Sequence, residues 1–156
     1  MGSLKISEGR FVQIYEDELK KELSKIATCE TYFGEFSSVD EIKIDTKKMP
    51  IIYVDFLGET PLNCYEVGVE FSLYIAHASF SKNENIRDSK RYEIYTLLED
   101  INKSLMAKTI LEAQPIKCKS SSKILDAKST NAYITIFKKN IEFTINTNLT
   151  QGDEIE

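Results

Sequence analysis

The stretch Cys64–Ala78, CYEVGVEFSLYIAHA, decides the fold because its apolar side chains fall at every second position. The apolar set is Tyr65, Val67, Val69, Phe71, Leu73 and Ile75. A strand sends successive side chains to opposite faces of its sheet, so the pattern predicts one long strand with an odd-numbered core face and a wetter even-numbered face. A helix is excluded, since it would mix Glu66 and Glu70 with the apolar set. The rest of the chain must cover the odd-numbered face.

Two other stretches have the three- and four-residue spacing of an amphipathic helix. The first runs from Ile6 to Ala27, with Ser7 as its N-cap. The second begins at the capping-box sequence 81–84 and reaches Lys108. Their apolar stripes are Phe11, Ile14, Tyr15, Leu19, Leu23 and Ile26 in the first, and Ile86, Ile94, Tyr95, Leu97, Leu98, Ile101 and Leu105 in the second. We expect both stripes to pack on the long strand.

Further strands are expected on either side of the second helix. Ile51–Leu57 is apolar almost throughout, and a short turn at 58–63 joins it to the long strand as an antiparallel hairpin. After the second helix, residues 110–116 are expected to be extended. The Ser- and Lys-rich residues 117–123 then lead into a short strand at 124–125.

The last strand pattern spans Thr130–Asn146, where Lys138 and Lys139 interrupt an alternation of apolar side chains. It is either one long strand or two strands that meet about Lys138–Asn140. We favour one strand with a bulge, because the sequence there lacks the glycine that a two-residue turn requires.

The predicted elements follow the order helix, strand, strand, helix, strand, strand. A length of 156 residues is typical of one domain. We therefore predict an α+β fold, a two-layer sandwich in which two helices pack on one face of a mostly antiparallel sheet of about four or five strands. Residues 1–147 form this single domain, and the polar, acidic residues 148–156 are expected to be a disordered tail.

Residues 28–49 have the least regular pattern. The alternation of isoleucine with charge at 41–45 is compatible with a short edge strand. Tyr32, Phe33 and Phe36 gather in the same segment. These aromatic side chains either pin the segment to the core or form a patch that binds a partner.

Composition excludes several classes of function. The chain has 25 acidic and 20 basic residues, interspersed, and lacks the clustered Lys and Arg that duplex nucleic acid requires. Cys29, Cys64 and Cys118 are far apart and form no metal-ligand spacing with the single histidine, so we expect three reduced thiols. No signal peptide and no long apolar run is present, which predicts neither export nor a membrane span.

The sequence contains no catalytic motif of the nucleophile-elbow, P-loop, dinucleotide-binding or zinc-protease type. His77 has no adjacent Asp, Cys or Ser motif, which favours a structural role. Glu66 and Glu70 lie four residues apart on one strand face, about 13 Å, too far to form one acid–base site. We predict that the protein is not an enzyme and that it has no metal and no cofactor.

Arg87 and Arg91 lie on one side of the second predicted helix, one to two turns before Ile94. One alternative is that their aliphatic stems cover the end of the core while the guanidinium groups reach water. The other is that they pair with carboxylates of a neighbouring subunit, since arginine suits bidentate interface contacts. The sequence leaves both open.

Four segments resemble the small tail proteins of Mu-like contractile-tailed phages, a family of tail terminator or completion proteins formerly catalogued as a domain of unknown function. The segments are MPIIYVDFLG (49–58), YEVGVEFSLYIAHAS (65–79), NIRDSKRYEIYTLLEDINKSL (85–105) and NAYITIFKKNIEFTIN (131–146). The similarity covers most of residues 8–147 and lies in the hydrophobic pattern and the order of elements.

The resemblance implies a virion structural protein that caps the end of the tail tube, stops its polymerisation and joins the tail to the head connector. Its partners would be further copies of itself in a ring, typically of six, the tail tube protein and the head–tail connector protein. DNA would be only passing cargo, and no membrane would be involved. The location would be the virion tail, and the host bacterial cytoplasm during assembly.

With this function, Glu66 and Glu70 are expected to face a lumen through which DNA slides without sticking. The expected subunit or tube contacts are Arg87, Arg91, Phe33 and Phe36. A second hypothesis is a cytosolic protein-binding adaptor or inhibitor domain without catalysis, which uses the aromatic segment 32–36. A third, a small enzyme with a shifted carboxylate or His77, has no motif in its favour.

Overall fold

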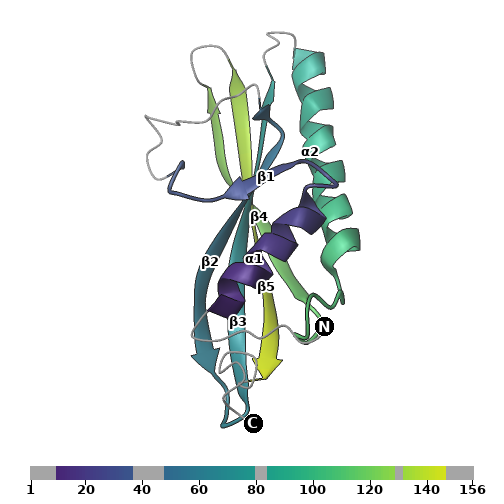
Figure 1. Cartoon of the computed structure of the whole chain (residues 1–156). Helices are drawn as coiled ribbons and strands as arrows, with labels where there is room; N and C mark the ends of the chain where they lie inside the picture. Colours follow the sequence, from purple (N-terminus) through teal and green to yellow (C-terminus); the bar gives the residue numbers. More distant parts are fainter. Residues whose placement is uncertain (1–9, 37–47, 80–83, 129–131, 147–156) are drawn as a thin grey trace.

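The computed structural model describes residues 10–36, 48–79, 84–128 and 132–146. They form two helices and a five-stranded, mostly antiparallel sheet, the α+β fold that the sequence predicts (Figure 1). The strand order in the sheet is β1-β2-β3-β5-β4. In chain order the elements are α1 (Arg10–Leu23), β1 (Thr28–Thr31), β2 (Ile51–Pro61), β3 (Glu66–Ser79), α2 (Glu84–Leu105), β4 (Lys117–Lys128) and β5 (Tyr133–Asn146).

The central strand is β3, which pairs antiparallel with β2 on one side and with β5 on the other. Its odd-numbered side chains from Val67 to Ile75 are buried under both helices, as the alternation predicts. Tyr65 was assigned to the same set, but it lies in the turn before β3 and is 73% exposed. The helices close this helix-side core with Phe11, Tyr15, Leu19, Leu23, Ile94, Leu97, Ile101 and Leu105.

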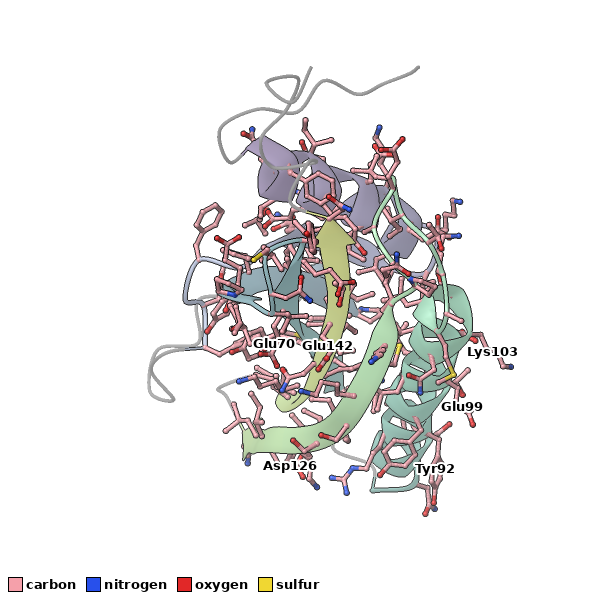
Figure 2. The ribbon with its side chains drawn as sticks, turned by 90° about the horizontal axis from the view of Figure 1, so that it is seen from below. Glu70, Tyr92, Glu99, Lys103, Asp126 and Glu142 are labelled. Carbon is pink, nitrogen blue, oxygen red and sulfur yellow. The ribbon has the colours of Figure 1, made fainter. Side chains whose placement is uncertain are left out.

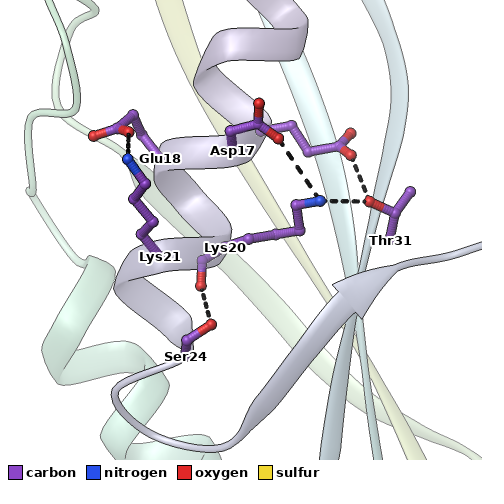
Figure 3. Close-up of polar contacts among 7 residues, drawn as sticks. Asp17, Glu18, Lys20, Lys21, Ser24 and Thr31 are labelled. Atoms are coloured by element: carbon purple, nitrogen blue, oxygen red, sulfur yellow. Dashed lines mark hydrogen bonds and ion pairs between the residues drawn. The ribbon is translucent and has the colours of Figure 1, made fainter.

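Helix α1 ends at Leu23 rather than at Ala27, because the chain turns there into an unpredicted strand. The Ser24 hydroxyl donates a 2.6 Å hydrogen bond to the carbonyl oxygen of Lys20 at the end of the helix (Figure 3). Lys20 Nζ then donates to the hydroxyl of Thr31 at 2.9 Å, and this hydroxyl donates to a carboxylate oxygen of Glu16 at 2.8 Å. These bonds tie β1 to α1. The first nine residues, including the proposed N-cap Ser7, lie outside the described residues.

Strand β1 pairs with β2 in parallel, Thr28–Thr31 against Ile51–Val54. The sequence did not reveal it, because TCET is four residues long and has no apolar alternation. The possible edge strand at 41–45 lies outside the described residues.

The β2–β3 hairpin is confirmed, but β2 continues past Leu57 to Pro61. Leu57 is an extra residue in a bulge, since the register shifts between Phe56 and Gly58. Gly58 has a φ of 151°, a backbone conformation that glycine adopts readily and other residues rarely. The bulge therefore allows the strand to continue where a turn was expected.

Strand β5 is one strand, as favoured, and pairs with β3 without interruption from Tyr133 to Asn146. The predicted bulge about Lys138–Asn140 was wrong, because the register shifts lie in β4. Strand β4 was also underestimated: it begins at Lys117, so the whole Ser- and Lys-rich run is strand. An edge strand exposed on both faces has no apolar alternation to reveal it.

Helix α2 ends at Leu105 rather than at Lys108. Ala107 has a φ of 60° and therefore cannot continue the helix. The predicted stripe is buried at Ile94, Leu97, Ile101 and Leu105, with Leu98 partly buried, whereas Ile86 and Tyr95 are a little under half exposed. Residues 110–116 were expected to be extended but form an irregular turn, with a φ of 55° at Leu111.

The face of the sheet opposite the helices carries a second, smaller core. The even-numbered face of β3, which was expected to contact solvent, is therefore only partly exposed. Tyr32, Phe36 and Met49 pack against this loop-side core. The even-numbered alternation of β3 did not predict it, because Ala76 and Ala78 are small and the cover comes from distant residues. The loop-side core consists of Ile51, Tyr53, Ala76, Ala78, Ala132, Ile134 and Ile136.

Candidate functional site

The half of the β2–β3 hairpin away from β1, residues 55–70, is here called the acidic hairpin. It contains Asp55, Glu59, Glu66 and Glu70, and no Lys or Arg occurs between Lys48 and Lys82. Several large apolar side chains are exposed in the same place: Phe56, Leu57, Leu62 and Tyr65. A surface that combines exposed apolar groups with charge of one sign is suited to contact with another macromolecule.

A groove of about 350 Å³ runs along the acidic hairpin. Gly58 and Gly68 leave it open because they have no side chains. Its walls include Leu57 and Leu62, with the carboxylates of Glu70 and Glu142 at one side. The hollow therefore offers apolar walls and acidic groups, and none of the described residues that line it is basic.

Glu70 and Glu142 lie directly opposite each other on β3 and β5, and both point to the face away from the helices (Figure 2). Like charges in this position repel. Lys119 relieves the repulsion, since its Nζ lies 2.8 Å from Glu142 Oε1 and 3.8 Å from Glu70 Oε2. The hydrogen bond with Glu142 raises the pKa of Lys119. Lys119 is thus shared between Glu70 and Glu142 in an ion-pair network inside the subunit.

Glu66 occupies the end of the same face of β3. Its Oε1 accepts a 3.0 Å hydrogen bond from the side-chain amide of Asn63 in the turn. The sequence thus predicted correctly that Glu66 and Glu70 share a strand face. It could not show that Glu70 has a cationic neighbour, because Lys119 is distant in the chain.

Tyr32, Phe36, Tyr53 and Tyr74 form an aromatic cluster over the upper part of the loop-side face. The rings of Tyr32 and Tyr74 stack with centroids 4.4 Å apart, and Phe36 meets Tyr53 edge-on at 5.5 Å. The backbone N–H of Phe36 donates a 3.3 Å hydrogen bond to the hydroxyl of Tyr32. In contrast, Phe33 is 84% exposed. Tyr32 and Phe36 therefore fit the first alternative, attachment of the segment to the core, while the partner-binding alternative stays a prediction that concerns exposed Phe33.

The sequence left two roles open for Arg87 and Arg91: cover of the end of the core, or contact with a neighbouring subunit or the tube. The guanidinium of Arg91 lies 3.8 Å from Asp126 Oδ2 on β4, and its side chain is about half exposed. The side chain of Arg87 lies outside the described part of the chain. Exposed Tyr92 lies next to Arg91 on α2, and Figure 2 shows Tyr92 at the outer side of that helix. The structure therefore places one arginine near an acid of its own chain.

His77 is buried at the end of β3, with Nε2 3.4 Å from a carboxylate oxygen of Glu93 on α2. The contact joins the strand to the helix, and the structural role that the sequence favours for His77 stays a prediction.

Sequence reasoning missed Lys139, whose side chain is 2% exposed. It lies on the helix-side face of β5, opposite Leu73 of β3. Its Nζ donates to the carbonyl oxygen of Lys119 at 3.4 Å and to the hydroxyl of Ser121 at 3.2 Å. Both acceptors are neutral, and burial lowers the pKa of Lys139. The sequence did contain a sign of this burial, because Lys139 occupies an odd-numbered position of the strand, like the buried Ile141 and Phe143.

The three cysteines, Cys29, Cys64 and Cys118, carry free thiols. Burial raises the pKa of Cys29 to about 12, which disfavours the nucleophilic thiolate. Across residues 10–36, 48–79, 84–128 and 132–146, no three His, Cys, Asp or Glu side chains come together to hold a metal ion.

Comparison of the sequence with protein-family models and with curated proteins gave no match. Neither of the two described helices is long and apolar enough to cross a membrane.

Proposed function

We propose that this protein is a structural protein of a phage tail, or of a phage-derived particle, that assembles as a ring on the end of the tail tube. The ring stops tube polymerisation and joins the tail to the head connector. The resemblance of four segments to Mu-like tail terminators is the starting point. The observation that carries the proposal is the acidic hairpin, whose carboxylates and exposed apolar side chains lie together on long strands.

Two properties of the acidic hairpin suit a ring through which DNA passes. Long, half-exposed strands offer surface for repeated contacts between copies, and a closed ring needs no active site. Glu66 and Glu70 on one strand face supply negative charge where a lumen wall would repel phosphates. Because Lys119 neutralises part of the charge of Glu70, Glu66 is the more effective repelling group of the two.

The proposal is tested by negative-stain microscopy of the purified protein, alone and mixed with growing tail tubes of its own particle. We expect rings, extra density at one tube end and tubes of limited length. Tubes that grow to the same length with and without the protein, and whose ends carry no added density, would contradict the proposal.

Variants make this test specific. Arg91→Ala removes a predicted contact and is expected to weaken capping while leaving the thermal midpoint nearly unchanged, since its only described ion pair is long and exposed. Lys103→Ala, on the exposed side of α2, is the matched control and is expected to cap normally. Equal capping by both variants would remove Arg91 from the interface.

The second candidate function is a protein-binding adaptor, and the observation in its favour is the exposure of Phe33. In that function Phe33→Ala abolishes partner capture in a pull-down without lowering stability. Phe36→Ala lowers stability because Phe36 packs on Tyr53 and Tyr74. Capture that survives Phe33→Ala would contradict the adaptor function.

A further inference from the structure

The sheet has two open edges in the described part of the chain. Strand β1 covers the outer edge of β2 only as far as Val54, so Asp55–Pro61 has no described strand beside it. Strand β4 is the last strand on the other side of the sheet, and among the described residues it pairs only with β5. An open edge presents backbone N–H and C=O groups that another extended chain can bind.

The two edges carry opposite charge. The open part of β2 contains Asp55 and Glu59 and no basic residue. Strand β4, KCKSSSKILDAK, contains four lysines and only one acid, Asp126. Lys119 and Lys123 are partly engaged by acids of their own subunit. Lys117 and Glu59 are exposed and make no ion pair within the described residues, so their charges remain available.

These charges decide which edges can meet. A second β4 edge would set lysines against lysines, and a second β2 edge would set acids against acids, both of which are unfavourable. We propose that the β4 edge of one copy adds to the open β2 edge of the next copy. This inference rests on the ring-forming function above. Because the contact joins two different surfaces, it repeats from subunit to subunit instead of stopping at a two-fold dimer, and it closes a ring when the rotations between copies complete a full turn.

Both edges also present an apolar side chain at a bulge. Leu57 is the extra residue of β2, and Ile124 is the extra residue of β4, opposite the step between Phe137 and Ile136. Each is 45% exposed. A bulge in an edge strand usually hinders pairing, but here each one turns an apolar side chain outward where a partner can cover it. The contact thus combines backbone pairing, unlike charges and apolar burial.

The test exchanges the charges of the two edges. The first variant, E59K/T60K, makes the β2 edge basic, and the second, K117E/K128E, leaves β4 with two lysines against three acids. All four positions are exposed, so folding is expected to be preserved and is checked by circular dichroism. The control variant, K103E/E99K, alters charge on α2, where both side chains are exposed and lie away from the sheet (Figure 2).

The assembly state is measured by sedimentation velocity at low ionic strength. The wild-type protein and the α2 control are expected to form one closed oligomer larger than a dimer. Each edge variant alone is expected to assemble about tenfold more weakly or not at all, because both of its edges then carry the same sign. An equal mixture of the two edge variants restores the oligomer, since every contact in an alternating ring again joins unlike charges.

Three outcomes would overturn the inference: a wild-type monomer, a two-fold dimer, or edge variants that assemble as well as the control. Failure of the edges is distinguishable from failure of the proposed function. If the edge variants still cap tubes, the proposed function stands and the proposed contact between the β4 and β2 edges is wrong. If the mixture restores rings but wild-type rings do not bind tubes, the edge contact stands and the proposed capping of tubes is wrong.

Discussion

Replacement of Tyr15 by Phe is expected to stabilise the protein. Tyr15 is fully buried between α1 and the sheet, and its ring stacks on Phe143 with centroids 3.9 Å apart. Its hydroxyl has no hydrogen-bond partner among the residues that the structure describes. Burial also raises the pKa of this phenol. The substitution keeps the ring and its stacking, and it removes only the buried polar atom.

The magnitude follows from the cost of a buried polar group without a partner, which is about 1–3 kcal/mol. Loss of the oxygen also removes a few dispersion contacts worth about 0.1–0.2 kcal/mol each. The net expectation is a gain of about 1 kcal/mol in the free energy of unfolding. For a chain of this length that raises the melting temperature by about 2–4 °C. Urea titration followed by circular dichroism measures the free energy directly.

Tyr32→Phe is the matched control, because the same atom is removed where it has a partner. The Tyr32 hydroxyl accepts the hydrogen bond from the Phe36 backbone N–H, so its loss is expected to destabilise by about 0.5–1 kcal/mol. The two substitutions therefore differ in sign. If Tyr15→Phe destabilises by as much as Tyr32→Phe, the Tyr15 hydroxyl is hydrogen-bonded after all, and the reasoning is refuted.

Three other substitutions test the sheet. Lys139→Met is expected to stabilise by on the order of 1 kcal/mol at pH 7, because the buried ammonium has only neutral acceptors. Burial lowers the pKa of Lys139, so the cost of burying its charge is full below the folded-state pKa and is relieved as pH rises towards the unfolded-state pKa near 10.5. The difference in free energy of unfolding between Lys139→Met and wild type, measured by urea titration, must therefore narrow in that pH window, and a constant difference would contradict the explanation. Lys119→Ala is expected to lower the melting temperature, most at low salt, because Glu70 and Glu142 then face each other alone, and Glu142→Gln in the same chain should recover the loss. Gly58→Ala is expected to cost about 1–3 kcal/mol in urea titration through its φ of 151° alone, since no atom lies within 4 Å of the added Cβ, and a change of a few tenths would show that the backbone relaxes.

The sequence predicted the parts of the fold in which one face alone is buried. The odd-numbered face of β3 and the stripes of both helices meet in one core, so their periodicity is clear. The same reasoning failed where burial depends on a distant partner. Strand β1 exists because Ile51–Val54 lie beside it, and the loop-side core exists because Tyr32 and Phe36 fold over Tyr74.

For the candidate site, the sequence shows that the hairpin is acidic, but it does not show which groups lie next to its carboxylates. The absence of basic residues between Lys48 and Lys82 is readable in the printed sequence. That Glu70 opposes Glu142 depends on the register of β3 and β5, which no short-range pattern determines. The sequence-based expectation that Glu66 and Glu70 line a lumen stays a prediction, with Glu70 as its weaker member.

The irregularities of β4 connect the core, the charged face and the open edge. The extra residue between Cys118 and Ser121 lets Lys119 reach Glu142 on one face while its carbonyl oxygen accepts the hydrogen bond of buried Lys139. In a regular strand successive side chains alternate strictly between the two faces. The bulge changes this alternation, so that the same short segment contacts Glu142 on one face and buried Lys139 on the other. The second shift exposes Ile124 at the edge. The irregular backbone of β4 therefore places Lys119 beside Glu70 and Glu142, and it also leaves the basic, partly apolar edge that we propose to contact the next copy.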